Sequence, residues 1–269
     1  MLKWLLFACF TLLSANEQKL FDAVIEGRLE YFRAGSVNSP HPAAAFHKVG
    51  GSYVYVSGIH YPMWNGVIGS DKEPDPEKIQ MAIGYFNSLN LPFMWWTNAD
   101  LGKYGFTFGG ILNGVAIDLE NNFPEAPANT VDVRVVNSET INTFSAICAG
   151  VFEMEYEVFN QSMNESMLHG DMVHFLAYVD DKPAGTVTLN IGSTAGIWGL
   201  ATLSEYRKQG IATALVYAAL KEAKTRNIPT AMAILMPKGM AWNLLAKLGF
   251  KSYHQFPFYI YGYDKELED

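Results

Sequence analysis

The residues best suited to chemistry lie in one short segment, residues 203–215. Within it, Arg207 and Gly210 belong to an Arg-x-x-Gly-x-Ala pattern that follows an apolar run and opens a long helical pattern. Such a loop presents several backbone N–H groups at a helix N-terminus, where the helix dipole favours an anion. Gly210 lets the backbone approach a ligand closely, and Arg207 and Lys208 add positive charge. The segment is therefore typical of a phosphate or pyrophosphate site.

Two neighbouring segments extend this pattern. Residues 202–207 read Thr-Leu-Ser-Glu-Tyr-Arg, and residues 241–250 read Ala-Trp-Asn-Leu-Leu-Ala-Lys-Leu-Gly-Phe. With the loop, they resemble the pyrophosphate loop, the Val-x-Pro-x-Tyr-Arg lead-in and the Ala-x-x-Leu-Tyr-x-Lys-Leu-Gly-Phe helix of the GNAT N-acetyltransferase superfamily. No Gly-Lys-Ser or Gly-Lys-Thr follows the loop, which excludes a Walker-type site. The resemblance covers roughly the second half of the chain, from about Thr130 to the end.

This resemblance implies an α/β fold with a mixed sheet flanked by helices. Acetyl-CoA would lie as co-substrate between two splayed parallel strands, residues 196–203 and 230–236, and no metal is implied. Splaying needs a break in strand pairing, which Gly199 could supply as a bulge residue; the alternative is that Gly199 only relieves crowding beside Trp198. The resemblance assigns acetyl-CoA contacts to Leu200, Ala201, Thr202, Leu203, Arg207, Lys208, Gln209, Gly210, Ile211, Ala212, Thr213 and Asn243.

The implied reaction is direct attack of a primary amine on the thioester, which calls for a base and an acid. The sequence departs from the family here. Leu245 stands where the family often has a Tyr that acts as the general acid, and Lys238 stands where the family often has Asn. The thiolate could leave unassisted, since a thiol pKa is only about 8.5. Otherwise the acid comes from the C-terminal segment; its candidates are Tyr253, His254, Tyr259 and Tyr261, of which we select Tyr259 and Tyr261. Packing is the alternative role for each tyrosine.

A second set of candidates borders the expected acceptor site. Glu153, Glu155 and Glu157 lie between two predicted helices, and their alternate spacing would place them on one side of an extended segment. They could bind a cationic acceptor or act through water, and we select Glu155 as a catalytic candidate. The alternative is a solvated helix start.

The chain divides near residues 121–129, an Asn- and Pro-containing linker. Residues 130–269 form the expected GNAT domain, with the order β-α-α-β-β-β-α-β-α-β. Its elements are predicted at residues 131–136, 139–151, 156–169, 173–179, 184–191, 196–203, 209–225, 230–236, 240–247 and 256–263.

Residues 1–120 echo this plan. Residues 103–106, Lys-Tyr-Gly-Phe, resemble residues 247–250, Lys-Leu-Gly-Phe, and both follow an apolar strand candidate, residues 93–96 in the first half. A helix begins at Asp75 and Pro76, but the preceding stretch is acidic and lacks the phosphate pattern. The first half is therefore interpreted as a degenerate GNAT-like lobe, with a chance repeat as the alternative.

Composition limits the possible partners. The chain of 269 residues is 49% hydrophobic and 17% charged, with a net charge of −8. These values indicate a well-buried globular protein and argue against nucleic acid as a partner, because no basic stripe is present. The six His form no metal-ligand pattern, and Cys9 and Cys148 fall in apolar settings typical of small core residues.

The N-terminus allows two interpretations. Residues 1–15 resemble a short signal peptide or an apolar core helix, and they are too few to span a bilayer. Ser14 and Glu17 form a capping box that predicts a helix to about Phe32. We expect a cytoplasmic protein that transfers an acetyl group to a small amine or a protein amine. The alternatives are a non-catalytic acyl-CoA-binding regulator or sensor, and a secreted protein that uses the fold without CoA.

Overall fold

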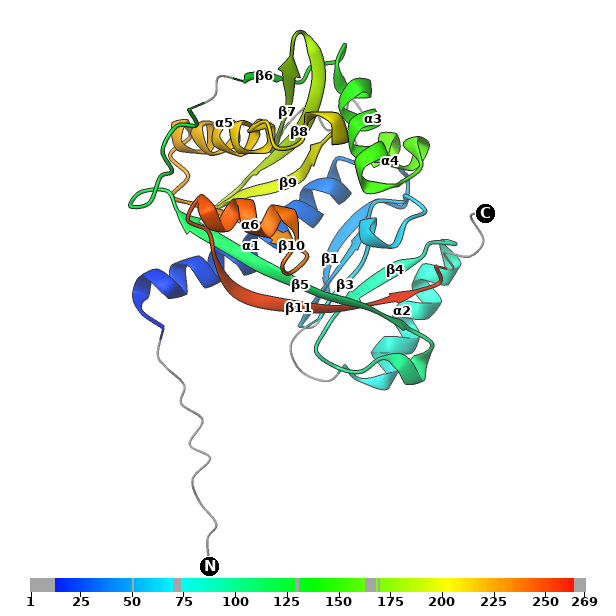
Figure 1. The fold of residues 1–269 in the computed structure, drawn as a ribbon. Coiled ribbons are helices and arrows are strands. Elements are labelled where there is room, and N and C mark those ends of the chain that lie inside the picture. Colours follow the sequence, from blue (N-terminus) through cyan, green and yellow to red (C-terminus); the bar gives the residue numbers. More distant parts are fainter. Residues whose placement is uncertain are drawn as a thin grey trace, which may run out of the picture.

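A computed structural model describes residues 13–49, 51–69, 74–128, 131–162, 168 and 170–263 of the chain. Its described part is built on one eleven-stranded sheet, with the order β1-β2-β3-β4-β11-β5-β10-β9-β8-β7-β6 (Figure 1). The sheet is mixed, because β3 and β4 run parallel, as do β9 and β10, while the other neighbours are antiparallel. The predicted mixed α/β fold is confirmed. The two interpretations of residues 1–15 fall mostly outside the described residues.

The N-terminal half contributes five strands to this sheet and also contains two helices. They are α1 Ala15–Val37, β1 Ala45–Val49, β2 Ser52–Val56, β3 Asn65–Ile68, α2 Pro76–Ser88, β4 Phe93–Trp96 and β5 Thr107–Asp118, with short 3-10 turns at Pro62–Trp64 and Gly102–Tyr104. The capping box at the start of α1 is confirmed: the Glu17 N–H donates to the Ser14 hydroxyl, and the Ser14 N–H donates to the Glu17 carboxylate. The helix then continues beyond Phe32 to Val37.

The C-terminal half follows the predicted order of elements. It comprises β6 Asp132–Val135, α3 Ile141–Phe152, α4 Tyr156–Ser162, β7 Met172–Val179, β8 Lys182–Ile191, β9 Ala195–Thr202, α5 Ile211–Thr225, β10 Thr230–Leu235, α6 Met240–Lys247 and β11 Lys251–Tyr261. Two bounds differ from the prediction by more than two residues. The helix predicted over residues 156–169 is described only to Ser162, and β11 begins five residues earlier than residue 256.

The last strands of the two halves are exchanged. β11, from the C-terminal half, lies between β4 and β5 of the N-terminal half, while β5 pairs with β10 of the C-terminal half. Each half thus places its final strand against the parallel pair of the other half. Residues 121–128, between the halves, contain no helix or strand, and Phe123 packs edge-on against Tyr217 of α5 with ring centroids 5.8 Å apart.

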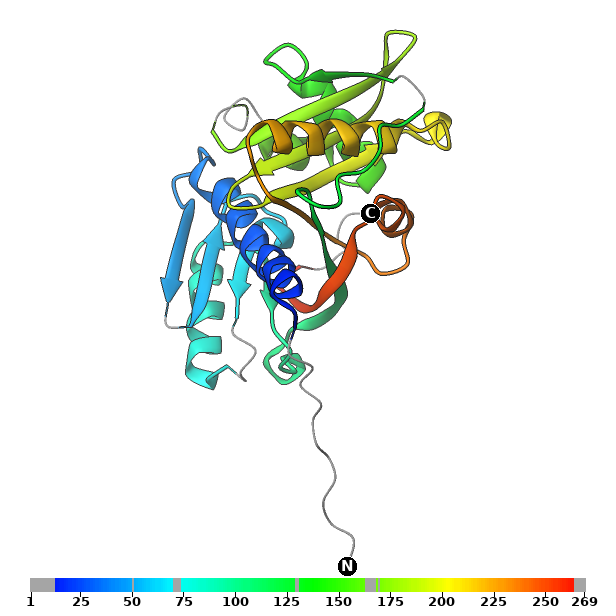
Figure 2. The same ribbon diagram turned by 90° about the vertical axis from the view of Figure 1, so that its left-hand side faces the viewer.

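Helix α1 lies on the concave face of the curved sheet (Figure 2). Phe32 stacks on Tyr55 of β2 at 4.3 Å and also contacts Trp198 of β9 at 6.4 Å, although six strand spacings separate these two strands. In a flat sheet that separation would be roughly 29 Å. The sheet must therefore curl around α1, which brings the same faces of both halves into contact with one helix.

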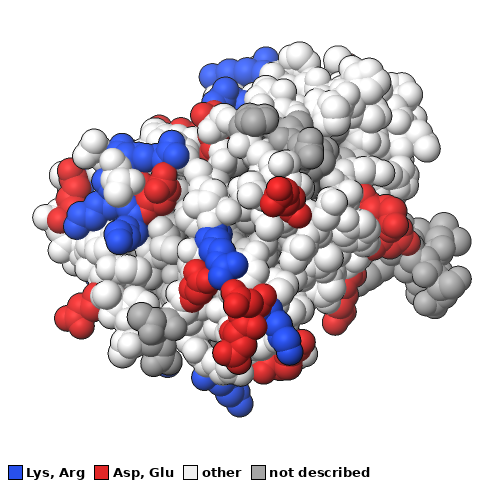
Figure 3. All heavy atoms as spheres, turned by 90° about the horizontal axis from the view of Figure 1, so that it is seen from above, with Lys and Arg blue, Asp and Glu red and all other residues white. Residues whose placement is uncertain are grey.

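The other face of the sheet is covered by α2, α5 and α6. Helix α5 buries an apolar stripe that includes Leu215, Ala219 and Ala223, as expected for residues spaced by one helical turn. Leu245 of α6 belongs to the same core cluster as this stripe. The surface seen in Figure 3 carries basic and acidic side chains interspersed among uncharged ones. None of the described helices is long and apolar enough to cross a membrane.

Candidate active site

The two parallel strand pairs of the sheet differ in the length over which their strands are paired. β9 and β10 are paired only at Ala195 with Ala231 and Gly196 with Met232, and the rest of both strands diverges. β3 and β4 pair along three residues, and the Gly69 N–H continues the ladder by donating to the Trp96 carbonyl at 3.0 Å. The C-terminal half therefore has an opening between parallel strands, whereas the corresponding pair in the N-terminal half is closed.

Gly199 forms the bulge at this opening, as its position in the apolar run predicts. The register between β8 and β9 shifts between Thr186 and Thr188, and Gly199 has a φ of +56°. This left-handed conformation is costly for residues that carry a Cβ. The extra residue turns the following part of β9 away from β10.

Two side chains hold the bulge in place. The Thr186 hydroxyl donates to the Gly199 carbonyl at 2.9 Å, and the Cys148 thiol lies 3.8 Å from the same oxygen. Burial raises the pKa of Cys148 to about 12, so this residue stays a thiol and a donor. Because the C=O and N–H of a trans peptide point in opposite directions, the Leu200 N–H points away from the Thr186 hydroxyl and the Cys148 thiol.

We expect Gly199→Ala to lower the free energy of unfolding by about 1–2 kcal/mol, the cost of a left-handed alanine. A Cβ at this position would meet its nearest atom, Thr188 Oγ1, at 3.4 Å, so the loss comes from the backbone rather than from a clash. Urea denaturation measures the change. Gly150→Ala in α3, where a Cβ meets nothing within 4 Å, is the control and should not destabilise. Equal stability of Gly199→Ala and wild type would contradict a required positive φ.

The predicted phosphate loop lies beyond the diverging end of β9. A 3-10 turn, Ser204–Tyr206, leads to Lys208 and Gly210, which have φ values of +62° and +84°. The first helical bond of α5 runs from the Ala214 N–H to the Gly210 carbonyl at 3.0 Å. The N–H groups at the start of the helix lie outside the helical bonding pattern, so they are suited to an anion.

Side chains of the loop brace its backbone. Arg207 Nε donates to the Thr202 carbonyl at 3.3 Å, and Gln209 Nε2 donates to the Glu205 carbonyl at 3.1 Å. Arg207, Lys208 and Gln209 are all exposed. The loop is thus held in shape while its positive charges remain accessible to a ligand.

The corresponding helix of the N-terminal half has no comparable start. At α2, the Asp75 carboxylate accepts a hydrogen bond from the Glu77 N–H at 2.9 Å, and Pro76 has no N–H to offer. A fixed negative charge repels a phosphate at this helix end. This supports the interpretation of the first half as a lobe that does not hold CoA in the same way.

The structure gathers most of the predicted acetyl-CoA contacts around the opening. Leu200, Ala201 and Thr202 lie on the part of β9 that pairs with β8 but not with β10, and Leu203 through Thr213 form the turn, the loop and the first turn of α5. Asn243 is exposed on α6, the helix that shares the α5 face of the sheet. Leu245, which stands at the position of the family's Tyr, is only 2% exposed and packs in the hydrophobic core.

The two predicted catalytic tyrosines lie elsewhere. On β4, Tyr261 is opposite Phe93 and Tyr259 is opposite Trp95. On β5, Tyr259 is opposite Phe108. Phe108 lies five residues along β5 from Asn113, which is the partner of Leu235 at the end of β10. That spacing places them roughly 17 Å or more along the sheet from the opening. Burial and then Asp100 raise the pKa of Tyr259. Neither hydroxyl can hydrogen-bond to a group held between β9 and β10, so we leave both out of the proposed mechanism.

The glutamates form helix ends rather than an extended segment. Glu153 caps α3 with a φ of +53°, the Met154 N–H donates to the Ala149 carbonyl, and the Glu155 carbonyl accepts from the Phe159 N–H in α4. The prediction that the three glutamates share one side of an extended segment is therefore wrong. Glu153, Glu155 and Glu157 are all exposed, and a catalytic role for Glu155 stays a prediction.

Sequence reasoning missed the residues that shape the opening from outside the motif. Thr186 and Cys148 fix the bulge, and Tyr31 of α1 stacks on Trp198 of β9 with ring centroids 3.8 Å apart. The sequence holds no local signal for these contacts, because they depend on strand register and on the placement of α1.

Comparisons with known proteins agree with this geometry. The model of the acetyltransferase (GNAT) family matches residues 141–250, whereas no curated protein matches the chain. A conserved protein of unknown function from Staphylococcus epidermidis has a similar fold, with a TM-score of 0.64 and 17% identity over 80% of this chain and 91% of that chain.

Two further solved structures share the fold over most of their length. A GCN5-related N-acetyltransferase from Kribbella flavida has a TM-score of 0.62 and 15% identity, over 88% of this chain and 95% of that one. A Drosophila protein has a TM-score of 0.56 and 16% identity, over 92% and 96% of the two chains. The match of the family model, the open strand pair and the phosphate loop together identify a domain of the acetyltransferase (GNAT) family at residues 141–250 of this chain.

Proposed function

We propose that this protein transfers an acetyl group from acetyl-CoA to a primary amine by direct attack on the thioester. The observation that carries the proposal is the opening between β9 and β10, which leads to the phosphate loop at the start of α5. The exposed N–H groups and the positive charges of Arg207 and Lys208 suit a pyrophosphate. The acceptor is a small amine or a protein amine.

The residues at the opening supply electrostatic stabilisation. The Leu200 N–H, oriented by the bond from Thr186 to the Gly199 carbonyl, polarises the thioester carbonyl and stabilises the negative charge that develops on its oxygen. Leu245 cannot donate a proton, so the thiolate leaves unassisted, as a thiol pKa of about 8.5 allows. No residue of β9 is Asp or Glu, so the proton of the attacking amine goes to water or to a group outside this strand.

A second candidate function is a non-catalytic acyl-CoA-binding regulator or sensor. The observation that favours it is the replacement of the family's Tyr by the buried Leu245, together with the lack of a carboxylate on β9. This candidate keeps the phosphate loop and the opening but makes no use of an acceptor.

Calorimetric titration with acetyl-CoA, followed by a thiol-release assay over a panel of amines, tests both candidates. The transferase predicts saturable binding and release of free CoA that depends on the amine. Saturable binding without release on any small amine or peptide amine would favour the regulator. No binding by folded protein would overturn both.

Thr186→Val is expected to lower the rate of acetyl transfer about tenfold while leaving the Kd of acetyl-CoA within about twofold. The change keeps the side-chain shape but leaves the partly buried Gly199 carbonyl without its hydroxyl donor, which costs about 1–3 kcal/mol and frees the Leu200 N–H to turn. Steady-state kinetics and calorimetry separate the two effects. Thr188→Val, equally buried on the same strand but bonded to His174, is the matched control. Equal rate losses in both variants would contradict a positioning role for Thr186.

A further inference from the structure

The sheet ends in two edge strands, β6 and β1, and these edges differ in their charge. At β6, Arg134 pairs with both Asp132 and Asp181, so ion pairs line that edge. The five residues of β1, Ala45–Val49, include one lysine and no Asp, Glu or Arg, and the strand pairs with β2 without a bulge. In Figure 2 it forms the left margin of the sheet, with no other described element beyond it. Edge strands are usually protected by charges, prolines or bulges, and β1 has only Lys48.

Two residues of β1 direct their backbone hydrogen-bonding groups away from the sheet. Two residues connect β1 to β2, and Val49 is opposite Ser52 across this connection. The pair that closes such a hairpin exchanges both backbone hydrogen bonds, and hydrogen-bonded pairs then alternate with non-hydrogen-bonded pairs along the ladder. The intervening residues, Phe46 and Lys48, therefore turn their N–H and C=O groups to the outer edge, where none of the described strands lies.

The side chains of Phe46 and Lys48 leave this edge open. The Phe46 ring stacks on Tyr53 of β2 with centroids 5.5 Å apart, and the Lys48 Nζ lies 5.4 Å from the centre of the same Tyr53 ring. Both side chains thus lie back over β2. Lys48, the one charged residue of the strand, covers a ring of its own sheet instead of blocking the edge.

We propose that β1 pairs with β1 of a second copy of this chain, antiparallel and with a twofold axis at His47. In this register Phe46 of one copy lies opposite Lys48 of the other. The two residues exchange both backbone hydrogen bonds on either side of the axis, so each outward N–H and C=O gains a partner. A second copy suits this edge because the register is symmetric, and one strand supplies both the donors and the acceptors that the other requires.

The side chains of β1 are compatible with this register. Lys48 faces Phe46 of the other copy and not a second lysine, so no like charges are opposed. On the opposite face of the sheet, Val49, which is 58% exposed, lies across from Ala45 and buries apolar surface. His47 is exposed and alone meets its own copy, in a non-hydrogen-bonded pair whose Cα atoms are about 4.5 Å apart.

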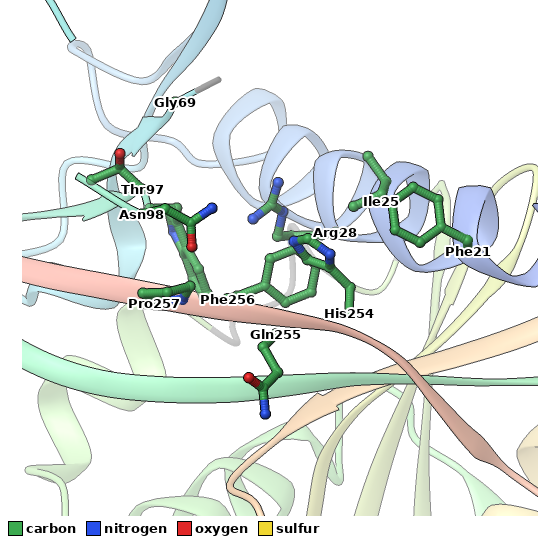
Figure 4. A pocket seen from close by; sticks show the side chains of 11 residues that line it. Phe21, Ile25, Arg28, Gly69, Thr97, Asn98, His254, Gln255, Phe256 and Pro257 are labelled. Carbon is green, nitrogen blue, oxygen red and sulfur yellow. The ribbon is translucent and has the colours of Figure 1, made fainter. Parts of the chain in front are cut away.

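The proposed interface lies away from the opening and from the cavity of the molecule. The acetyl-CoA opening begins at β10, six strand spacings from β1 in the sheet. A cavity of about 230 Å³ lies between α1, β4 and β11, and none of the residues that line it, such as Arg28, Trp96 and Phe256, belongs to β1 or β2 (Figure 4). Pairing of two β1 strands therefore leaves both open and does not depend on acetyl transfer.

Sedimentation velocity of the full chain tests the proposal. The interface is one short strand pair, so the dimer should dissociate on dilution within the range of about 1 μM to about 1 mM that is typical of small interfaces. We expect a reversible equilibrium between monomer and dimer, with no larger species. A single monomeric species over the whole range would overturn the proposal, as would open-ended association.

Two charge variants at the twofold axis test the register. His47→Glu and His47→Lys each oppose two like charges in the dimer, and His47 is exposed, so neither change should disturb the monomer. We expect at least tenfold weaker association of each variant alone and recovery of the dimer in an equimolar mixture, where Glu faces Lys. Val135→Glu, at an exposed valine of the β6 edge, is the matched control and should associate as wild type does.

Three outcomes would refute this interface. They are association of either His47 variant alone with wild-type affinity, a mixture of the two variants that stays monomeric, and loss of the dimer in Val135→Glu. Acetyl-CoA titration of the His47 variants should give the wild-type result, whichever result that is, because the opening lies elsewhere in the sheet.

Discussion

Gly210→Asp is expected to raise the Kd of acetyl-CoA at least 100-fold. Gly210 has a φ of +84° and stands immediately before α5, so a carboxylate there would lie among the N–H groups proposed to bind the pyrophosphate. A 100-fold change corresponds to about 2.8 kcal/mol, which repulsion between a phosphate and a nearby carboxylate readily supplies. Calorimetric titration of the folded variant measures the change.

A matched control separates charge from backbone strain. Gly170 has a φ of +85°, and a Cβ there would meet nothing within 4 Å. Gly170→Asp therefore imposes the same left-handed aspartate without touching the loop. It should bind acetyl-CoA as wild type does, while both variants lose similar stability. A Gly210→Asp protein that is folded and still binds within threefold of wild type would refute the phosphate-loop assignment.

Gly27→Ala, in the middle of α1, is expected to destabilise the protein by about 1–3 kcal/mol, the usual cost of overpacking a core. A Cβ at Gly27 would come within 2.7 Å of both Met232 Cγ and Thr194 Cγ2. Thr194 cannot turn away freely, because its hydroxyl donates to the Thr230 carbonyl and accepts from the Thr230 hydroxyl. The substitution would push α1 off the strands of the other half. Urea denaturation gives the change in free energy of unfolding.

A glycine-to-alanine substitution at Gly35 of the same helix should change the free energy of unfolding in the opposite direction. At Gly35 of α1 a Cβ meets nothing within 4 Å, so Gly35→Ala should stabilise the protein by up to about 1 kcal/mol through helix propensity. A stabilising Gly27→Ala would show that α1 does not pack against β10 as closely as the structure indicates.

The parts of the fold and site that follow from local chemistry were predictable. The phosphate loop depends on Gly210 and the residues beside it, and the α1 start depends on Ser14 and Glu17; both are encoded within a few residues. A bulge at Gly199 was one of two interpretations that the sequence allowed, because a glycine inside an apolar strand often marks a bulge, and the structure confirms it. The order of elements in the second half follows from the same short-range periodicity.

The parts that depend on distant register were not predictable. Tyr259 and Tyr261 lie within a strand whose sequence resembles a domain's own last strand, yet the exchange moves that strand into the other half. The hydroxyl of Thr186 reaches Gly199 only because β8 and β9 pair in one register. Arg28 belongs to a helix pattern that gives no sign of a cavity, because Phe256 and Trp96 come from remote parts of the chain.

The exchanged strands also constrain how the protein is made. β4, with its two tryptophans, gains β11 as a neighbour only after residue 261 has been synthesised. Until β11 has emerged from the ribosome, the N-terminal half exposes a hydrophobic strand edge, and such edges promote aggregation. The two halves therefore complete their folding together once β11 has been made, and the strands made first depend on residues 251–261 for protection.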